Sequence, residues 1–151
     1  MLIGVISDTH GLLRDEVLVA LAEVEHILHA GDVGDFDILR RLGAIAPVTA
    51  IRGNVDLQGR CAELPATDAV ELAGKTFYLV HSVRDLDLNP VAAGVAVVVS
   101  GHSHKASTEW KQGVLYLNPG SAGPRRFNLP VTVALVTVGE KDIFAKVEEL
   151  L

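Results

Sequence analysis

The chain has little of what marks several large classes of protein. Its 151 residues include a single cysteine, Cys61, which excludes an internal disulfide and is typical of a reducing compartment. Aromatic residues make up only 5% of the chain, so Leu, Val, Ile and Ala must fill the interior. There is no run of Lys or Arg, and the net charge is −6. These features argue against a protein that holds nucleic acid by its backbone.

Long apolar segments are also missing. The apolar stretch 91–100 is too short to cross a bilayer. The N-terminal sequence MLIGVISDTHG has no basic flank and reaches Asp8 early, unlike a signal peptide. We therefore expect a cytoplasmic protein with one domain, residues 1–151, and no membrane partner. The sequence leaves homo-oligomer formation open.

What is present is an alternation of apolar runs and amphipathic segments. The runs are continuous in apolar residues, as in strands covered on both faces. The pattern predicts strands at 2–7, 26–30 and 48–52, with helices at 15–25 and 35–43 between them. Asp15 is the expected N-terminal cap of the first helix.

After a surface loop at 55–66 the pattern changes from alternating strands and helices to hairpins. Gly74 and Gly113 each indicate a hairpin, the first between 68–73 and 75–80. Further predicted elements are a short helix at 85–93 and strands at 95–100, 131–138 and 142–150. The fold class predicted is α/β with a layered α+β character.

Polar residues of metal-ligand type follow five of the apolar runs. They are Asp8, His10, Asp32, Asn54, His81, His102 and His104. Ligands bind at the carboxyl edge of open α/β sheets, so this arrangement predicts a polar site there.

Spacing indicates the chemistry of that site. Asp8 and His10 are an i, i+2 pair, as are His102 and His104, and an extended backbone would project both members of a pair to one side. Seven ligands exceed the need of one ion, but with a bridging carboxylate they give two ions four ligands each. Oxygen and imidazole without thiolate suit Mn²⁺, Fe²⁺, Zn²⁺ or Ni²⁺ better than Mg²⁺, and Mn²⁺ is the ion we expect. Two ions about 3.5–4 Å apart can generate a hydroxide and clamp an in-line displacement at phosphorus.

Six motifs in order resemble the calcineurin-like metallophosphoesterases, above all their small, cap-less prokaryotic phosphodiesterases. The motifs are DTH (8–10), GD (31–32), GNVD (53–56), the strand-end His81, GHSH (101–104) and NPGS (118–121). The resemblance implies a two-sheet β-sandwich flanked by helices, an αββα arrangement.

The resemblance also implies a division of the ligands. The first metal would be held by Asp8, His10, Asp32 and His104. The second would be held by Asp32, Asn54, His81 and His102. Asp32 would bridge the two ions, Asn54 would also contact the phosphate, and the NPGS loop would border the site and bring Arg125 to a phosphate oxygen.

Two positions depart from the family pattern. Many members place a His directly after the Asn of the third motif, where it is thought to protonate the leaving group, whereas this chain has Val55. Members also commonly follow the strand-end His with Gly-His, whereas His81 is followed by Ser82 and Val83. The second departure concerns the loop at about 82–90, which we expect to shape the substrate pocket.

Each of these residues has a plainer alternative role. Asp8 and Asp32 could cap helices, and the strand-end histidines could be core residues. His26 and His29 precede the GD motif and are expected to have helix-end or packing roles. Asp56 is expected to hydrogen-bond groups around the metals rather than to bind metal.

These patterns predict a hydrolase acting on phosphoric ester bonds, most specifically a phosphodiesterase in which a metal-held hydroxide attacks phosphorus. Its substrate would be a small phosphoester. The alternatives are a phosphomonoesterase or nucleotide hydrolase on the same site, and a non-catalytic scaffold such as the retromer subunit that shares this fold. Specificity is expected in the loops 11–14, 55–66, 82–90 and 121–128.

Overall fold

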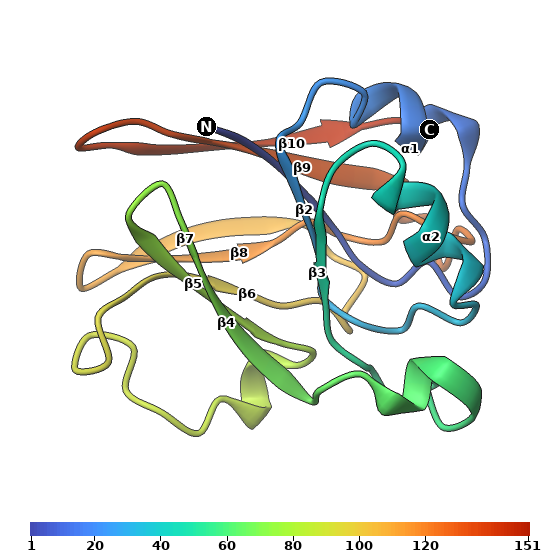
Figure 1. Ribbon diagram of the computed structural model, residues 1–151, viewed down its shortest axis with the longest axis horizontal. Helices are drawn as coiled ribbons and strands as arrows, with labels where there is room; N and C mark the ends of the chain where they lie inside the picture. Colours follow the sequence, from blue (N-terminus) through green and yellow to red (C-terminus); the bar gives the residue numbers. More distant parts are fainter.

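The computed structural model describes residues 1–151 and consists of two five-stranded sheets packed face to face (Figure 1). The first sheet has the order β10 (Ile143–Glu149), β9 (Thr132–Val138), β1 (Leu2–Ile6), β2 (His26–His29) and β3 (Val48–Ala50). The second has the order β4 (Thr67–Leu72), β5 (Lys75–Val80), β6 (Val95–Val99), β8 (Val114–Asn118) and β7 (Ser107–Lys111).

The centre of each sheet is parallel. Strands β1, β2 and β3 run in one direction, and β5, β6 and β8 run in one direction within the second sheet. The antiparallel partners β9, β10, β4 and β7 lie toward the edges. The parallel strands deliver their carboxyl ends, and the polar residues that follow them, to one edge of the sandwich.

Apolar side chains fill the space between the sheets, which explains the continuous apolar runs. Fifteen buried residues form this core, among them Ile3, Leu28, Phe77, Val97 and Leu117. The predicted two-sheet sandwich is confirmed. None of the helices is long and apolar enough to span a bilayer.

Helices α1 (Asp15–Ala20) and α2 (Asp37–Gly43) both pack on the outer face of the first sheet. The outer face of the second sheet has no α-helix. Leu86 and Leu88, from the loop after the 3₁₀ turn η2 (Val83–Asp85), pack there instead. The helices therefore flank the sandwich on one side, and a loop closes the other.

Helix α1 ends five residues before the predicted boundary at 25, and its predicted cap is wrong. Asp15 is the first helical residue, and Arg14 precedes it without a side-chain cap. Glu25 is drawn into pairing with β1, because its N–H donates to the Leu2 carbonyl and its carboxylate accepts the Leu2 N–H at 2.7 Å. This pairing stops the helix, although Leu21 and Val24 stay buried.

The predicted helix at 85–93 is wrong. The segment has only the 3₁₀ turn at its start and a turn at 90–94. Pro90 disfavours helical backbone at Asn89, whose side-chain oxygen instead accepts the Ala92 N–H at 3.2 Å. The loop 55–66 contains a further 3₁₀ turn, η1 (Gly59–Glu63).

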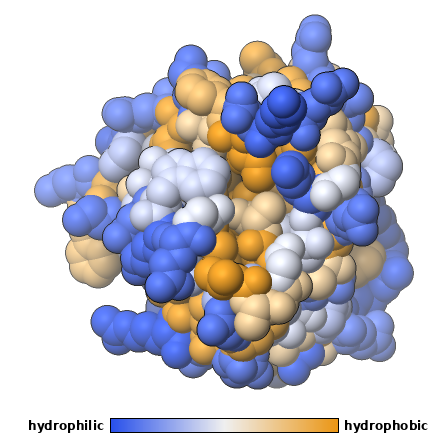
Figure 2. All heavy atoms as spheres, turned by 90° about the vertical axis from the view of Figure 1, so that its left-hand side faces the viewer, coloured by the Kyte–Doolittle hydropathy of each residue, from blue (hydrophilic) through white to orange (hydrophobic).

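Both predicted hairpins are confirmed, and they lie at the edge opposite the polar residues. Their two-residue turns, Ala73-Gly74 and Gln112-Gly113, have positive φ at both positions, between 50° and 80°. In Figure 1 these tips point to the left. Figure 2 looks onto this hairpin edge and shows apolar side chains at its centre with hydrophilic side chains projecting around them.

Candidate metal centre

Six of the seven predicted ligands gather in two groups at the carboxyl edge. Asp8, His10 and His104 form one group, and Asp32, His81 and His102 form the other. Within each group the ligand-type atoms lie within 4.8 Å of one another. Each group therefore has the donor types and spacing that a divalent ion requires.

The two groups form one centre. His10 Nε2 lies 3.6 Å from Asp8 Oδ1 and 3.5 Å from Asp32 Oδ2. His81 Nε2 lies 3.2 Å from the same Asp32 oxygen and 4.0 Å from Asp8 Oδ1. The Asp32 carboxylate thus stands between an imidazole of each group.

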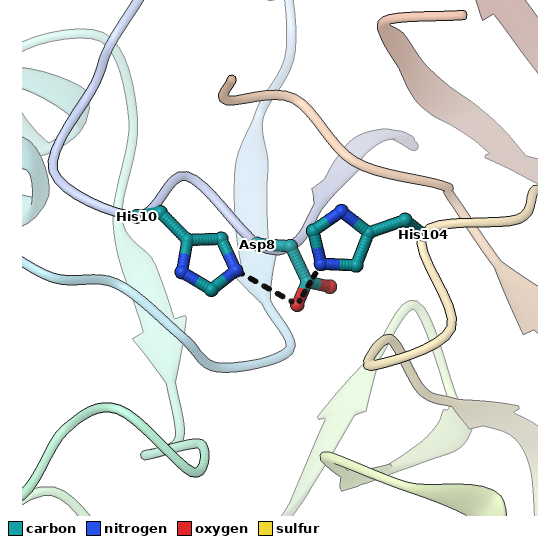
Figure 3. A group of neighbouring side chains, drawn as sticks. All are labelled: Asp8, His10 and His104. Carbon is teal, nitrogen blue, oxygen red and sulfur yellow. Dashed lines mark ion pairs between the residues drawn. The ribbon is translucent and has the colours of Figure 1, made fainter. Parts of the chain in front are cut away.

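Several atoms at this centre are buried without a hydrogen-bond partner. Figure 3 shows the His10 and His104 rings approaching the Asp8 carboxylate from two sides, with His104 Nε2 3.4 Å from Asp8 Oδ1. Asp8 Oδ1, His10 Nε2 and His81 Nε2 all lack a partner in the protein. Orphaned buried polar atoms are costly. Their convergence fits a cationic group that would satisfy them together.

The backbone at the centre is unusual. Five of the candidate ligands have positive φ, between 46° and 71°: Asp8, His10, Asp32, His102 and His104. Such residues cost of order 1–3 kcal/mol each. The predicted convergence of the i, i+2 pairs is present, but its expected cause is wrong. A left-handed turn after each strand, rather than extended backbone, turns the side chains inward.

Two glycines let the ligand loops approach closely. A Cβ at Gly53 would collide with the side chain and backbone of Asp32. A Cβ at Gly101 would collide with the Ser7 hydroxyl and lie 2.6 Å from Asp8 Oδ2. The glycines of GNVD and GHSH are thus required by packing against the two carboxylates.

Each carboxylate has one oxygen fixed by the protein and one directed to the centre. Asp8 Oδ2 accepts the Ser7 hydroxyl at 2.6 Å and the His102 N–H at 3.0 Å. Asp32 Oδ1 accepts the Val55 N–H at 3.0 Å. The remaining oxygens, Asp8 Oδ1 and Asp32 Oδ2, are those that face the imidazoles.

His81 is oriented by its backbone neighbour. Its Nδ1 lies 2.7 Å from the Ala30 carbonyl, so Nδ1 carries the proton and donates it there. This fixes the tautomer and leaves Nε2 to face Asp32, an arrangement typical of metal-binding histidines. Burial opposes protonation of His81, but the Asp32 carboxylate 3.2 Å away and the hydrogen bond to the Ala30 carbonyl outweigh it and raise its pKa.

The other titratable groups are also perturbed. Burial raises the pKa of Asp8 and lowers the pKa of His10 and His104. Burial acts against ionisation of Asp32 too, but the close His81 imidazole and the hydrogen bond from the Val55 N–H hold its pKa below the ordinary range. The shifts of His10, His104 and Asp32 favour the neutral imidazoles and ionised carboxylate that metal binding needs, whereas the raised pKa values of Asp8 and His81 favour their protonated forms until a cation displaces the protons.

Sequence reasoning missed the contribution of His29. It is fully buried, its Nδ1 accepts the Gly31 N–H at 3.1 Å, and its Nε2 lies 3.0 Å from the Thr9 hydroxyl. Thr9 in turn donates to the Val33 carbonyl at 2.8 Å. His29 therefore links the DTH loop to the GD loop. Its position in an apolar run just before GD was the signal available.

Asp56 has the role predicted for it. It accepts the backbone N–H groups of Val33 at 3.1 Å, Gly34 at 3.0 Å and Gly53 at 2.8 Å. It belongs to neither ligand group. This buried carboxylate ties the GD loop to the GNVD loop.

The remaining candidates lie around the rim. Asn54 is exposed and lines a hollow with His81. Arg125 is exposed on loop 124–130, and the charge of its neighbour Arg126 adds to burial in lowering the pKa of His10 and His104. The NPGS loop borders the centre as a clamp, because the Ser121 hydroxyl donates to the Asp8 carbonyl at 3.1 Å.

Comparisons with known proteins agree with this geometry. Residues 1–141 match the "Calcineurin-like phosphoesterase superfamily domain". The chain is 35% identical over 153 residues to the "Probable metallophosphoesterase" of Methanothermobacter thermautotrophicus, covering 93% of this chain and 88% of that protein.

Two solved structures share the fold. One is described as a novel archaeal phosphodiesterase, with a TM-score of 0.80 and 23% identity over 98% of this chain and 100% of that one. The other is Vps29 from Entamoeba histolytica complexed with Zn²⁺, with a TM-score of 0.75 and 19% identity over the whole of both chains.

The resemblance based on six motifs is thereby confirmed over nearly the whole chain. The chain belongs to the calcineurin-like phosphoesterase superfamily, a family of hydrolases that cleave phosphoester bonds with the help of divalent metal ions.

Proposed function

We propose that residues 1–151 form a single catalytic domain that hydrolyses phosphodiesters at a two-ion centre. The observation that supports this most is the position of Asp32 Oδ2, which lies 3.5 Å from His10 Nε2 of one group and 3.2 Å from His81 Nε2 of the other. The ligand sets are those expected from the resemblance. Asp8, His10, Asp32 and His104 hold one ion, and Asp32, Asn54, His81 and His102 hold the other.

Two divalent ions there would supply an activated water nucleophile and the charge that stabilises the transferring phosphoryl group. The protein's contribution is to hold the ligands in place. Val55 N–H and Ala30 carbonyl fix Asp32 and His81. The exposed Asn54 amide can donate to a phosphate oxygen. The oxygen and imidazole donors favour Mn²⁺, with Fe²⁺, Zn²⁺ and Ni²⁺ as alternatives.

A diester is favoured over a monoester because the centre has room for two substituents. One hollow of about 350 Å³ reaches the centre at His102. A second hollow of about 350 Å³ reaches it at Asn54 and His81. Each lies within the size range of small-molecule sites. A monoester would need only one of them.

Position 55 bears on the leaving group. Val55 is 47% exposed at the rim and has no group that can donate a proton to a departing oxygen. Positioned acids contribute about 10²–10⁴-fold, and stable leaving groups need little of that help. We therefore expect aryl diesters to be cleaved much faster than alkyl diesters, with Val55→His recovering part of the difference. A flat dependence on leaving-group pKa would show that another residue donates the proton.

A scaffold is the competing function, because Vps29 has the same fold. That structure holds Zn²⁺, so metal binding alone does not separate the two functions. Turnover does. The six ligand-type side chains that gather at the centre favour the enzyme.

The test is activity after metal reconstitution. Metal-free protein loaded with Mn²⁺ should bind two ions per chain by elemental analysis and hydrolyse bis(p-nitrophenyl) phosphate faster than p-nitrophenyl phosphate. A chelator should abolish turnover. Two bound ions without turnover on any diester or monoester would favour a scaffold, and faster turnover of the monoester would assign a phosphomonoesterase.

A further inference from the structure

The hollow beside His102 differs in charge from the hollow beside Asn54. The first has Arg84, Lys111 and Glu109 in its wall, with two positive charges and one negative. The second has Arg52, Asp85 and Asp87, with one positive charge and two negative. The chain as a whole has a net charge of −6, so the cationic wall is local.

The short turn η2 separates the two hollows. Ser82, Val83 and Arg84 line the hollow at His102, whereas Asp85 lines the hollow at Asn54. Arg84 follows His81 by three residues, so its Cα lies at most about 11 Å from the Cα of His81. Arg84 is exposed, and it forms no ion pair in the protein. A cation without a partner thus stands close to the reacting centre.

The floor of the same hollow extends along the outer face of the second sheet. Ser107, Glu109 and Lys111 alternate on β7, and Tyr116 lies opposite Glu109 on β8. At about 3.4 Å per residue, the distance from Ser107 to Lys111 is roughly 14 Å. Lys111 Nζ lies 5.0 Å from the Tyr116 ring centroid and 3.7 Å from Glu109. The hollow is therefore a groove that extends along β7, with Lys111 at the end of the strand and Arg84 in the wall contributed by η2.

Most side chains along the groove are polar. Only three of its thirteen lining residues are hydrophobic, and Ser82, Ser103 and Ser107 present hydroxyl groups. Such walls suit a polar, hydroxylated substituent.

We infer that the groove between η2 and β7 holds the substituent that remains on phosphorus, and that this substituent is polar and carries a second negative charge. The inference rests on the proposed phosphodiesterase function. An anionic arm is attracted by Arg84 and Lys111 and is repelled by Asp85 and Asp87 at the other hollow. The charges therefore orient the diester, with its leaving group at the Asn54 side.

The test compares two diesters that share one leaving group. Thymidine 5′-(p-nitrophenyl phosphate) and its 3′-phosphorylated derivative differ only by the terminal phosphate. The Mn²⁺-loaded enzyme should have the higher kcat/KM for the phosphorylated compound, and this preference should shrink as ionic strength rises. Octyl p-nitrophenyl phosphate should be a poorer substrate than either.

Variants identify the residue responsible. Arg84→Gln should lower the ratio of the two kcat/KM values about fivefold, the scale of a partly exposed ion pair. Lys111→Gln should lower it less, because Glu109 already pairs with Lys111. Arg41→Gln, which changes an exposed arginine on α2, should leave the ratio unchanged.

The outcomes separate this inference from the proposed function. Equal kcat/KM values for the two thymidine diesters, or a ratio unaffected by Arg84→Gln, would overturn the inference alone. Rapid turnover of the octyl diester would overturn the polar character of the groove. No turnover of any of the three diesters would overturn the phosphodiesterase itself.

Discussion

The two edges of the sandwich use the same backbone conformation for different purposes. At the hairpin edge, Ala73 and Gln112 have φ values of 50° and 51° and each precedes a glycine. A Cβ at Gly74 or Gly113 would meet nothing within 4 Å, so these turns are open to solvent. Right-handed strand twist favours such two-residue turns, and the conformation serves chain reversal.

At the carboxyl edge the left-handed residues are the candidate ligands themselves, and their surroundings are packed. Asp8 and Asp32 are buried, and each is fixed by hydrogen bonds from loops distant in sequence. Strain there is held in place by the neighbouring structure, as expected at functional sites. Left-handed backbone therefore indicates a functional site when the residue has a polar, buried side chain that hydrogen bonds from other loops hold in place.

The largest expected effect concerns the carboxylate between the two groups. Asp32→Asn removes the charge shared by both ions, so kcat/KM should fall by at least about 10²-fold, more than loss of a surrounding hydrogen bond costs. Elemental analysis should show fewer than two ions per chain. Asp142→Asn, the same change beside the β9–β10 hairpin, should leave both values unchanged. Two tightly bound ions in Asp32→Asn would contradict the bridging role.

The next effect concerns the link between ligand loops. His29→Ala removes the hydrogen bonds to Thr9 and Gly31, and we expect a loss of about 10-fold or more in Mn²⁺ affinity or in activity. The packing role expected from sequence agrees with the full burial of His29, and the proposed link between the ligand loops adds to it. His26→Ala removes a hydrogen bond to Thr49 on the neighbouring strand β3, away from the ligand loops, and should leave metal affinity unchanged. Equal metal affinity in the two variants, both folded by circular dichroism, would return His29 to a packing role.

The buried His29 also makes stability depend on pH. Burial lowers the pKa of His29 to about 4 in the folded chain, against 6.5 when exposed. The unfolded state therefore binds more protons between these values, and the stability present above pH 6.5 is lost as pH falls toward 4. Metal-free protein should lose about 2 kcal/mol more between pH 7 and pH 5 than His29→Gln does. Urea unfolding at the two pH values measures this, and equal losses would contradict it.

The smallest effect compares the edges directly. Glycine relieves left-handed strain of about 1–2 kcal/mol at an entropic cost of about 0.5–1 kcal/mol. His102→Gly and Gln112→Gly should therefore each stabilise the metal-free protein by about 0.5 kcal/mol. Thermal unfolding checks this, and only His102→Gly should lose activity. If His102→Gly destabilised the protein, its conformation would not be strained.

Much of the fold could be predicted because it rests on local patterns. Apolar runs identified the central strands, and Gly74 and Gly113 identified the hairpins. The end of α1 could not be predicted, since it depends on Glu25 pairing with Leu2 across the chain. The segment 85–93 has helical composition, but Pro90 and the Asn89 side chain direct a turn.

The residues of the candidate centre could be predicted from the sequence, but the backbone conformation and the loop contacts that position them could not. Parallel strands bring polar end residues together, so Asp8, Asp32 and His81 could be grouped from sequence. Their left-handed backbone and the link through His29 and Thr9 depend on contacts between loops. The charge of the groove depends on β7 lying beside η2, two segments that sequence patterns do not associate.

Asp56 has a consequence for how the protein acquires its ions. A single carboxylate holds the amides of Val33, Gly34 and Gly53, so the spacing of the two loops is set by the protein before any ion arrives. The ions then bind to a preformed site, and their binding is not coupled to folding as it is in the zinc domains that unfold without metal. Calorimetry of ion binding would register a small heat-capacity change, and the protein could exchange ions with its surroundings while remaining folded throughout.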